Sequence, residues 1–526
     1  MGIRISILIG VFSLLYSLLI FHLYNLQLQK GSYYQAKADS IASWTDASNS
    51  TRGSIYFTTQ SGDPVPVAIT VNESVIYAVP KEVKNEAQAV SELQKVSGLS
   101  KASLAKSLGN KASLYAPIVP KATASEVAEI DSAKIAGLAV KEVPGRSYPL
   151  GQTASQLLGY TEASDPTQGE YGLELSDNQK LNAGQNVYLT IDSNIQAEAE
   201  SLLTGLVTKY NATGGTIVVE DPKTGKILAM ASNPSFDPNN YGAYPIGNFL
   251  NPAVQDVYEP GSVMKAVTMA SGLDAGSVTP ETTYNDTGKL VVDGQTIMDW
   301  DQKAHGITDM TTVIADSLNI GAAFVERQLG NPAFLSYLKK FGFNQKTDIG
   351  LPGEVVGSLA GLVGPNSRDV NYATASFGQG VSVTPVRMVE AISAIANHGV
   401  MMRPYLDASE SSQEIGRVVS TQASEEAVKM MTIDVLHGAI AKISGYNVAG
   451  KSGSAQVPNL KTGGYTNQLI DSYVGFAPAY NPRFVILVKL NEPAGAPLSG
   501  VVVPTFHDLA QYILNYYNVP PDNVSQ

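Results

Sequence analysis

The order of strand-like and helical runs constrains the fold of this chain most. Two apolar runs joined by a turn, at 216–220 and 227–231, precede a long and mostly helical middle, and two more, at 473–477 and 484–490, follow it. Short runs rich in Val, Ile and Phe are typical of buried strands. Strands at both ends of a helical region predict an α+β domain in which the two ends share one sheet, with the helices packed against it.

Length and composition exclude several classes of protein. At 526 residues the chain has room for two or three domains with sizeable cores. Its net charge of −12, without a basic patch, argues against nucleic acid as a partner. It has no cysteine, which excludes a thiol nucleophile, a Cys-ligated zinc and disulfides, and is compatible with an extracytoplasmic protein.

An apolar run of 20 residues, Ile5–Tyr24, opens the chain. This length is enough to cross a bilayer as one helix. The nearby small-x-small sequence Ala36–Ala38 lies well past it in polar sequence. We therefore expect an uncleaved transmembrane anchor over 1–28. Positive charges flank the run on both sides, so the positive-inside rule leaves its orientation open.

The rest of the chain divides by composition. Residues 29–184 mix strands and short helices, rich in Ala, Ser and Lys, and hold no acid/base cluster or metal spacing, so we expect a structural pedestal. The strand pattern described above begins at about 185 and predicts a second domain over 185–518. The tail, 519–526, contains two adjacent prolines, and we expect it to be disordered.

A Pro-Gly pair at 260–261 precedes a run without helix breakers, so we expect a helix with Ser262 in its first turn. Ser262 and Lys265 then share one face. The helix is apolar almost all round, which is typical of a buried helix, where a charged lysine is costly. A neutral Lys265 could take the Ser262 proton during nucleophilic attack. The pattern is short, however, and Ser103 to Lys106 matches it too.

Two further motifs follow Ser262 in the order that a serine acyl transferase of this type needs. They are Ser317-Leu318-Asn319 and Lys451-Ser452-Gly453, the second within a run of small residues, 448–457, that predicts an extended strand. Other matches lie out of order or in polar loops. These are Ser176–Asn178, Lys223–Gly225 and Lys461–Gly463.

With these motifs in order, the chain resembles a class B penicillin-binding protein, the monofunctional D,D-transpeptidase of peptidoglycan synthesis. The likeness covers nearly the full length. Its further landmarks are Arg52–Ile55, Arg146–Pro149, Leu158–Tyr160, Gly169–Glu174, Leu189–Asp192, His305-Gly306, Phe377–Gly380, Thr384-Pro385 and Val474–Pro478.

The resemblance implies a transmembrane helix, an elongated pedestal and a transpeptidase domain with an antiparallel sheet flanked by helices. It also implies a cytoplasmic-membrane protein with its catalytic domain outside, and a polytopic glycosyltransferase as partner. Its role in division or elongation stays open. No cofactor or metal is expected. The implied catalytic residues are Ser262, Lys265 and Ser317, and the implied substrate-binding residues are Asn319, Lys451, Ser452, Gly453 and Ser454.

The implied reaction is cross-linking of peptidoglycan stem peptides through an acyl-enzyme on Ser262, with release of D-alanine. β-Lactams should acylate the same serine. A β-lactamase or β-lactam sensor of the same fold is an alternative, although the Glu-x-x-x-Asn segment at 281–285 comes before Ser317. Gly445–Ser452 also fits a nucleotide-binding P-loop, but Gly453 and Pro458 oppose the helix that this loop requires.

The five histidines show no metal-ligand spacing among themselves. His305 lies ahead of the Ser317 motif, and we interpret it as structural and not as a base.

Overall fold

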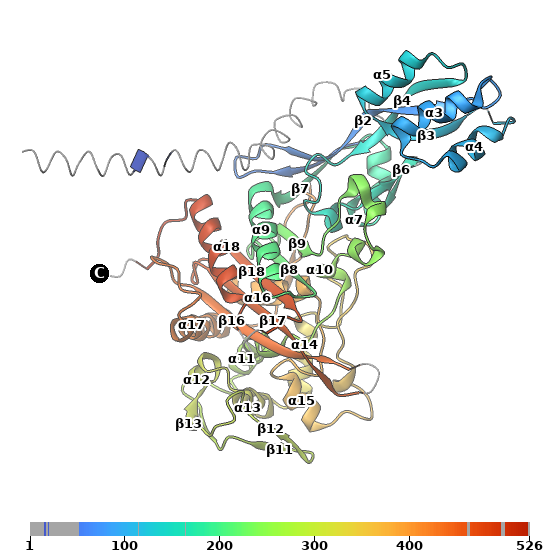
Figure 1. The fold of residues 1–526 in the computed structure, drawn as a ribbon. Helices are drawn as coiled ribbons and strands as arrows, with labels where there is room; N and C mark the ends of the chain where they lie inside the picture. Colours follow the sequence, from blue (N-terminus) through green and yellow to red (C-terminus); the bar gives the residue numbers. More distant parts are fainter. Residues whose placement is uncertain are drawn as a thin grey trace, which may run out of the picture.

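The computed structural model of the chain describes residues 15–16, 19, 52–113, 115–163, 165–459, 463–495 and 500–523 (Figure 1). Within these ranges no helix combines the length and apolar character that a membrane crossing needs. The predicted anchor over 1–28 falls almost entirely outside the described residues, so it stays a prediction.

Five antiparallel strands form the central sheet, in the order β16-β17-β18-β8-β9. Strand β18, which follows the helical middle, pairs directly with β8, which precedes it, and Val488 lies opposite Ile217. This confirms that the two ends of the domain share one sheet. The strands are β8 (Gly214–Glu220), β9 (Ile227–Asn233), β16 (Ala449–Pro458), β17 (Tyr465–Ala477) and β18 (Phe484–Asn491).

Side chains of this sheet alternate between two hydrophobic clusters, as the pleat of a strand requires. Val218, Val485 and Leu487 belong to the first cluster, whereas Ile217 and Ile486 belong to the second. Both faces are therefore covered by helices. The first is covered by α11 (Met264–Asp274), α16 (Pro385–Ala396) and α17 (Thr421–Gly438), and the second by α9 (Ser193–Lys209) and α18 (Val503–Tyr516).

The helical middle extends to the end of the molecule opposite the pedestal (Figure 1). It carries two small antiparallel strand pairs, β10 with β13 and β11 with β12. Its elements are β10 (Thr283–Asp286), β11 (Leu290–Val292), β12 (Gln295–Ile297), β13 (Gly306–Asp309), α12 (Met310–Ala315), α13 (Asn319–Leu329), α14 (Asn331–Lys340), η7 (Ala360–Leu362) and α15 (Asp369–Ala375). Around it lie η4 (Pro238–Ala243), η5 (Ile246–Phe249), α10 (Pro252–Gln255), β14 (Val400–Met402) and β15 (Glu414–Arg417).

The pedestal is a second sheet, and its strand β7 continues into the domain that holds the central sheet. Strand β7 pairs in parallel with β1 and ends at Asp192, whose carboxylate caps α9 by accepting the N–H groups of Asn194 and Ile195. The elements are β1 (Ile55–Thr58), β2 (Val65–Ala78), α3 (Glu86–Ser97), α4 (Lys101–Gly109), β3 (Ala116–Ala122), α5 (Ala124–Ala133), β4 (Leu138–Ser147), α6 (Ser155–Leu158), β5 (Tyr160–Glu162), β6 (Asp165–Glu170), α7 (Gly172–Ser176), α8 (Asn178–Asn182) and β7 (Val187–Asp192).

A buried ion cluster joins three pedestal segments that lie far apart in the sequence. Arg52 donates to Glu174 Oε2 from Nε at 3.0 Å and from Nη2 at 2.5 Å. Arg146 donates from Nε to Glu174 Oε1 at 2.7 Å, and the Tyr148 hydroxyl donates to the same oxygen at 3.3 Å. The three charged side chains are at most 3% exposed. One buried carboxylate thus accepts hydrogen bonds from two guanidinium groups.

The tail is not disordered from 519 as expected. Asn447 donates to the Asp522 carboxylate from its backbone N–H at 2.8 Å and from its side chain at 3.1 Å. The Asn523 N–H donates to Gly445 O at 3.0 Å. These bonds attach the tail to the turn before β16, so its composition alone was misleading. Only 524–526 fall outside the described residues at this end.

Replacement of Glu174 by glutamine should unfold the pedestal readily. Glutamine keeps the shape but leaves two buried guanidinium groups without a counter-charge, so we expect a loss of about 3–5 kcal/mol in the free energy of unfolding. Chemical denaturation of the full chain in detergent would measure it. Glu92→Gln removes a carboxylate from an exposed pair with Lys95 and should leave the transition unchanged. Equal transitions for the two variants would contradict the prediction.

Candidate active site

Ser262 lies in a tight turn that leads into a buried helix. A 3₁₀ turn, η6 (Gly261–Val263), precedes α11, so the predicted helix begins two residues later than expected. All residues from 264 to 273 are buried, as predicted. Gly261 has φ 55°, and an added Cβ would lie 2.7 Å from Ser454 O. The turn therefore requires glycine, both for its backbone conformation and for its closeness to β16.

Lys265 is enclosed beneath this turn, with 1% of its surface exposed. Its Nζ donates to Ser317 O at 2.6 Å and lies 3.3 Å from Ser317 Oγ. Burial lowers the pKa of Lys265 well below its usual value, and the positive charge of Lys451 lowers it further. The carboxylates of Asp299 and Asp434 act in the opposite direction. A neutral amine in this place can accept a proton.

Ser317 lies in the short connection between α12 and α13. Its φ is 55°, a left-handed conformation that a residue with a side chain adopts only when its surroundings fix it. Asn319 is the first residue of α13, and its Nδ2 donates to Met298 O at 2.9 Å. Both side chains are half-buried. Of the middle motif, Ser317–Asn319, only the last residue belongs to a helix, and the other two are held in place by their neighbours.

Strand β16 forms the other wall of the site, in the extended conformation that the sequence predicted. Lys451 is fully buried, and its Nζ donates to Asp434 Oδ1 on α17 at 3.2 Å. Ser454 Oγ donates to Asp471 Oδ1 on the neighbouring strand at 2.9 Å. Gly453 packs below the turn that holds Ser262, where an added Cβ would lie 2.5 Å from Pro260 O. Because a strand and not a helix follows the Gly445–Ser452 match, the P-loop interpretation fails.

The cleft between these elements has a volume of about 710 Å³. Lys265 and Gly453 lie behind its surface, since they do not line it, whereas the other six predicted residues do. Those six are Ser262, Ser317, Asn319, Lys451, Ser452 and Ser454. The structure thus brings together the residues of all three motifs.

The competing motif matches lie elsewhere. Ser103 and Lys106 are exposed on α4 of the pedestal. Lys223–Gly225 forms the turn between β8 and β9, and Ser176–Asn178 connects α7 to α8. Lys461 and Thr462 fall outside the described residues.

Sequence reasoning missed several residues of the cleft. Asp434 and His437 come from α17, and Trp300 and Asp316 come from the helical middle. The Trp300 Nε1 donates to Asp316 O at 3.0 Å, and His437 Nδ1 lies 3.4 Å from Asp316 Oδ1. No motif marks these positions, because each reaches the cleft through packing between elements far apart in the chain.

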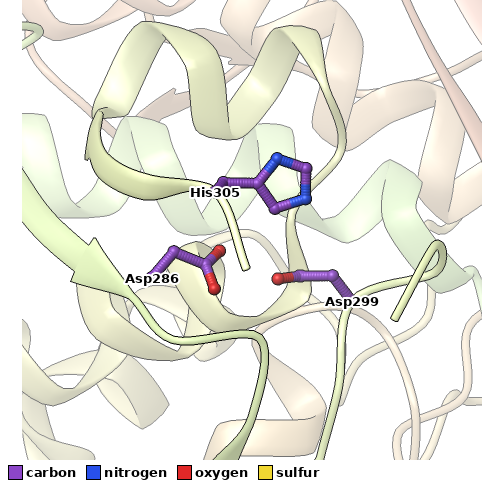
Figure 2. Close-up of side chains that lie close together, drawn as sticks. All are labelled: Asp286, Asp299 and His305. Atoms are coloured by element: carbon purple, nitrogen blue, oxygen red, sulfur yellow. The ribbon is translucent and has the colours of Figure 1, made fainter. Parts of the chain in front are cut away.

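Asp286, Asp299 and His305 gather beside the cleft (Figure 2). The two carboxylates face each other with the imidazole ring next to them, and one ligand-type atom from each residue lies within 4.8 Å of the others. Oxygen and imidazole nitrogen are atoms that divalent cations accept as ligands. The cluster combines one histidine with two aspartates from separate segments, so no histidine spacing in the sequence marks it. His305 also lines the cleft, although it was interpreted as structural.

Comparison with known proteins gives two family matches. Residues 215–511 match the penicillin-binding protein transpeptidase domain, and residues 47–226 match the penicillin-binding protein dimerisation domain. The two matches together cover the pedestal and the domain that holds the cleft. The predicted boundary at 184 stays a prediction.

Individual relatives extend over most of the chain. Stage V sporulation protein D of Bacillus subtilis is 33% identical over 479 residues, which are 82% of this chain and 73% of that protein. The peptidoglycan D,D-transpeptidase FtsI of Escherichia coli is 28% identical, over 90% of this chain and 85% of that protein. Penicillin-binding protein 2X from Streptococcus thermophilus has a similar structure, with a TM-score of 0.71, 25% identity, and coverage of 89% of this chain and 80% of that chain.

Replacement of Asp434 by asparagine should destabilise the domain around the cleft. The change leaves the fully buried ammonium group of Lys451 without its counter-charge, so we expect a loss of about 3–5 kcal/mol in the free energy of unfolding. Thermal unfolding would measure it. Asp316→Asn removes a carboxylate that is 41% exposed and pairs with an exposed histidine, and should change stability little. A similar melting temperature for both variants would show that Lys451 does not depend on Asp434.

Proposed function

This chain is a class B penicillin-binding protein, and from that premise we propose which of its residues carry out peptidoglycan D,D-transpeptidation. It is a serine acyltransferase that cross-links stem peptides. The observation that carries the assignment of residues is the enclosed Lys265, which lies behind the cleft one helical turn from Ser262 and contacts Ser317, while Ser262 and Ser317 both line the cleft.

In the proposed acylation step, Ser262 Oγ attacks the carbonyl carbon of the penultimate D-alanine of a stem peptide. Lys265 Nζ takes the hydroxyl proton, which its lowered pKa supports. The resulting oxyanion accepts hydrogen bonds from the backbone N–H groups of Ser262 and Ser454. The C–N bond to the terminal D-alanine then breaks, and Ser317 passes a proton to the departing amine.

The stem peptide that donates the acyl group is bound between Ser317–Asn319 and β16. Asn319 donates to the donor amide, and Ser452 with the positive charge of Lys451 binds the terminal carboxylate. Lys451 acts from beneath the surface, because Asp434 holds its ammonium group. Gly453 contributes by its small size, which lets β16 lie against the nucleophile turn.

The acyl-enzyme is then attacked by the amine of a neighbouring stem peptide, which forms the cross-link and releases Ser262. β-Lactams acylate Ser262 in the same way. The sequence after Ser317 lacks a Glu-x-x-x-Asn segment that could activate a hydrolytic water, so we propose that the β-lactam adduct is long-lived and that the protein is not a β-lactamase.

We also propose that residues 1–28 form a single-pass anchor in the cytoplasmic membrane, with the catalytic domain outside. The apolar run Ile5–Tyr24 supports this proposal, because its length suits a bilayer. A polytopic membrane glycosyltransferase, which would supply the glycan strands, is the proposed partner of the anchor and pedestal.

A fluorescent penicillin should label the purified full chain covalently, and Ser262→Ala should abolish the labelling because it removes the attacking oxygen. Labelling is read on a denaturing gel. Ser103→Ala is the matched control, since Ser103 has the same Ser-x-x-Lys pattern on an exposed pedestal helix, and it should label fully. Labelling of Ser262→Ala, or none of the wild type, would refute the proposed function. Rapid hydrolysis of a chromogenic cephalosporin would favour the β-lactamase alternative.

The full chain should stay with membranes after extraction with alkaline carbonate, whereas protein without residues 1–28 should be released. An apolar helix of this length is held by the hydrocarbon core and not by charge. Fractionation and immunoblotting would measure the distribution. Release of the full chain by carbonate would count against the anchor.

A further inference from the structure

Residues Met298–Trp300 hold the middle motif at three points. The Asn319 Nδ2 donates to Met298 O at 2.9 Å, and the Ile320 N–H donates to Asp299 Oδ1 at 3.1 Å. The Trp300 Nε1 donates to Asp316 O at 3.0 Å. Three consecutive residues therefore bond to both sides of Ser317. Such support is needed because Ser317 has a positive φ that its own sequence does not favour.

The central residue of this segment is enclosed. Asp299 is 2% exposed and faces the Asp286 carboxylate (Figure 2). Asp286 is itself fixed, since it accepts the Tyr284 hydroxyl at 3.0 Å and the Gly288 N–H at 2.7 Å. His305 completes the surroundings of Asp299. Asp299 therefore lies between two fixed groups. These are the Asp286 carboxylate at the end of β10 and the Ile320 N–H group of α13.

The hydrogen bond to Ile320 alone does not explain why this residue is an acid. The amide oxygen of asparagine would accept the same N–H group and would avoid placing a carboxylate opposite Asp286. What asparagine could not supply is negative charge, which Asp299 carries above about pH 6 because burial and the Asp286 carboxylate raise the pKa of Asp299 to about 6. The charged groups that act on Lys265 are Lys451 from β16, Asp434 from α17 and Asp299.

These charges have opposite effects on the proposed base. Burial and Lys451 both lower the pKa of Lys265, whereas the two carboxylates raise it. A general base must be neutral at the working pH and still basic enough to hold the transferred proton. Asp434 already pairs with Lys451, so Asp299 is the carboxylate that remains to limit the lowering.

We propose that Asp299 is a positioning residue for acyl transfer: it fixes Ser317 and Asn319 through the Met298–Trp300 segment, and its charge supports Lys265 as the base. This proposal rests on the proposed function. It differs from a purely structural role in one respect, because removal of the charge alone should change the pH dependence of acylation.

The test is the rate of penicillin acylation of the full chain, measured across pH. In Asp299→Asn the bond to Ile320 can persist while the negative charge is lost. The pKa of Lys265 should then fall, so Lys265 stays neutral at lower pH and the acid limb of the profile moves to lower pH. In Asp299→Ala the bond is lost as well, and the plateau rate should also drop about 10- to 100-fold because Ser317 and Asn319 lose their support.

One variant serves as a control for the charge. Asp301→Asn removes a carboxylate that lies two residues from Asp299, pairs with His305 and does not act on Lys265, so the acid limb should stay at the wild-type pH. An unchanged limb in Asp299→Asn, with labelling intact, would overturn the proposal and leave the proposed function standing. A wild-type chain that fails to label would refute the proposed function itself.

Two further measurements cover other outcomes. If Asp299→Asn does not fold, as its melting curve would show, Trp300→Phe tests the segment alone: the exposed indole loses its bond to Asp316 O, and the plateau should fall several-fold with the limb unchanged. A wild-type rate in Trp300→Phe would then overturn the proposal.

Acylation is also measured with a chelator and with added Zn²⁺. A limb that depends on either would show that Asp286, Asp299 and His305 act as a cation site, which also overturns it.

Discussion

The burial of two lysine side chains beside one cleft is the constraint on which the site depends. Lys265 and Lys451 are each at most 1% exposed. Two buried ammonium groups repel each other, so the free-energy cost of burying both lysines falls if one of them is neutral. Lys451 keeps a carboxylate partner in Asp434, whereas Lys265 donates to a carbonyl and a hydroxyl of Ser317. The arrangement therefore favours a neutral amine at Lys265. A neutral amine there suits the base role proposed for Lys265, because Ser262 lies in the turn that leads into the same helix.

The close approach of two backbones makes this burial achievable. The turn before α11 and the strand β16 lie so near each other that Gly261 and Gly453 have no room for a side chain. Gly378 fills the same need on the other side, since an added Cβ there would lie 2.2 Å from Gly261 O. Glycine at these positions lets the surrounding elements close over Lys265. The helix α11 can then be apolar all round, because sheet and helices enclose it.

Much of the fold and of the motif set could be predicted, and the exceptions have a common cause. Periodicity indicated the shared sheet, and breakers indicated the turn at Pro260-Gly261, because both depend on neighbours in the chain. Asp434, Asp299 and Trp300 carried no local signal, since each acts through a partner brought to it by packing. The tail was predicted wrongly for the same reason: its prolines suggested disorder, while Asp522 accepts hydrogen bonds from Asn447 in the fold.

The sequence by itself determined the chemistry that this protein can perform, through the order of Ser262, Ser317 and Lys451 and through the landmarks that surround them. It also marked Arg52, Arg146 and Glu174 as separate landmarks without relating them. Only the tertiary structure decided that those three form one ion cluster, that Lys451 pairs with Asp434, and that Met298–Trp300 support the middle motif. The reason is physical. Residue types and local spacing limit what a side chain can do, but its charge state and position depend on groups that only folding places beside it.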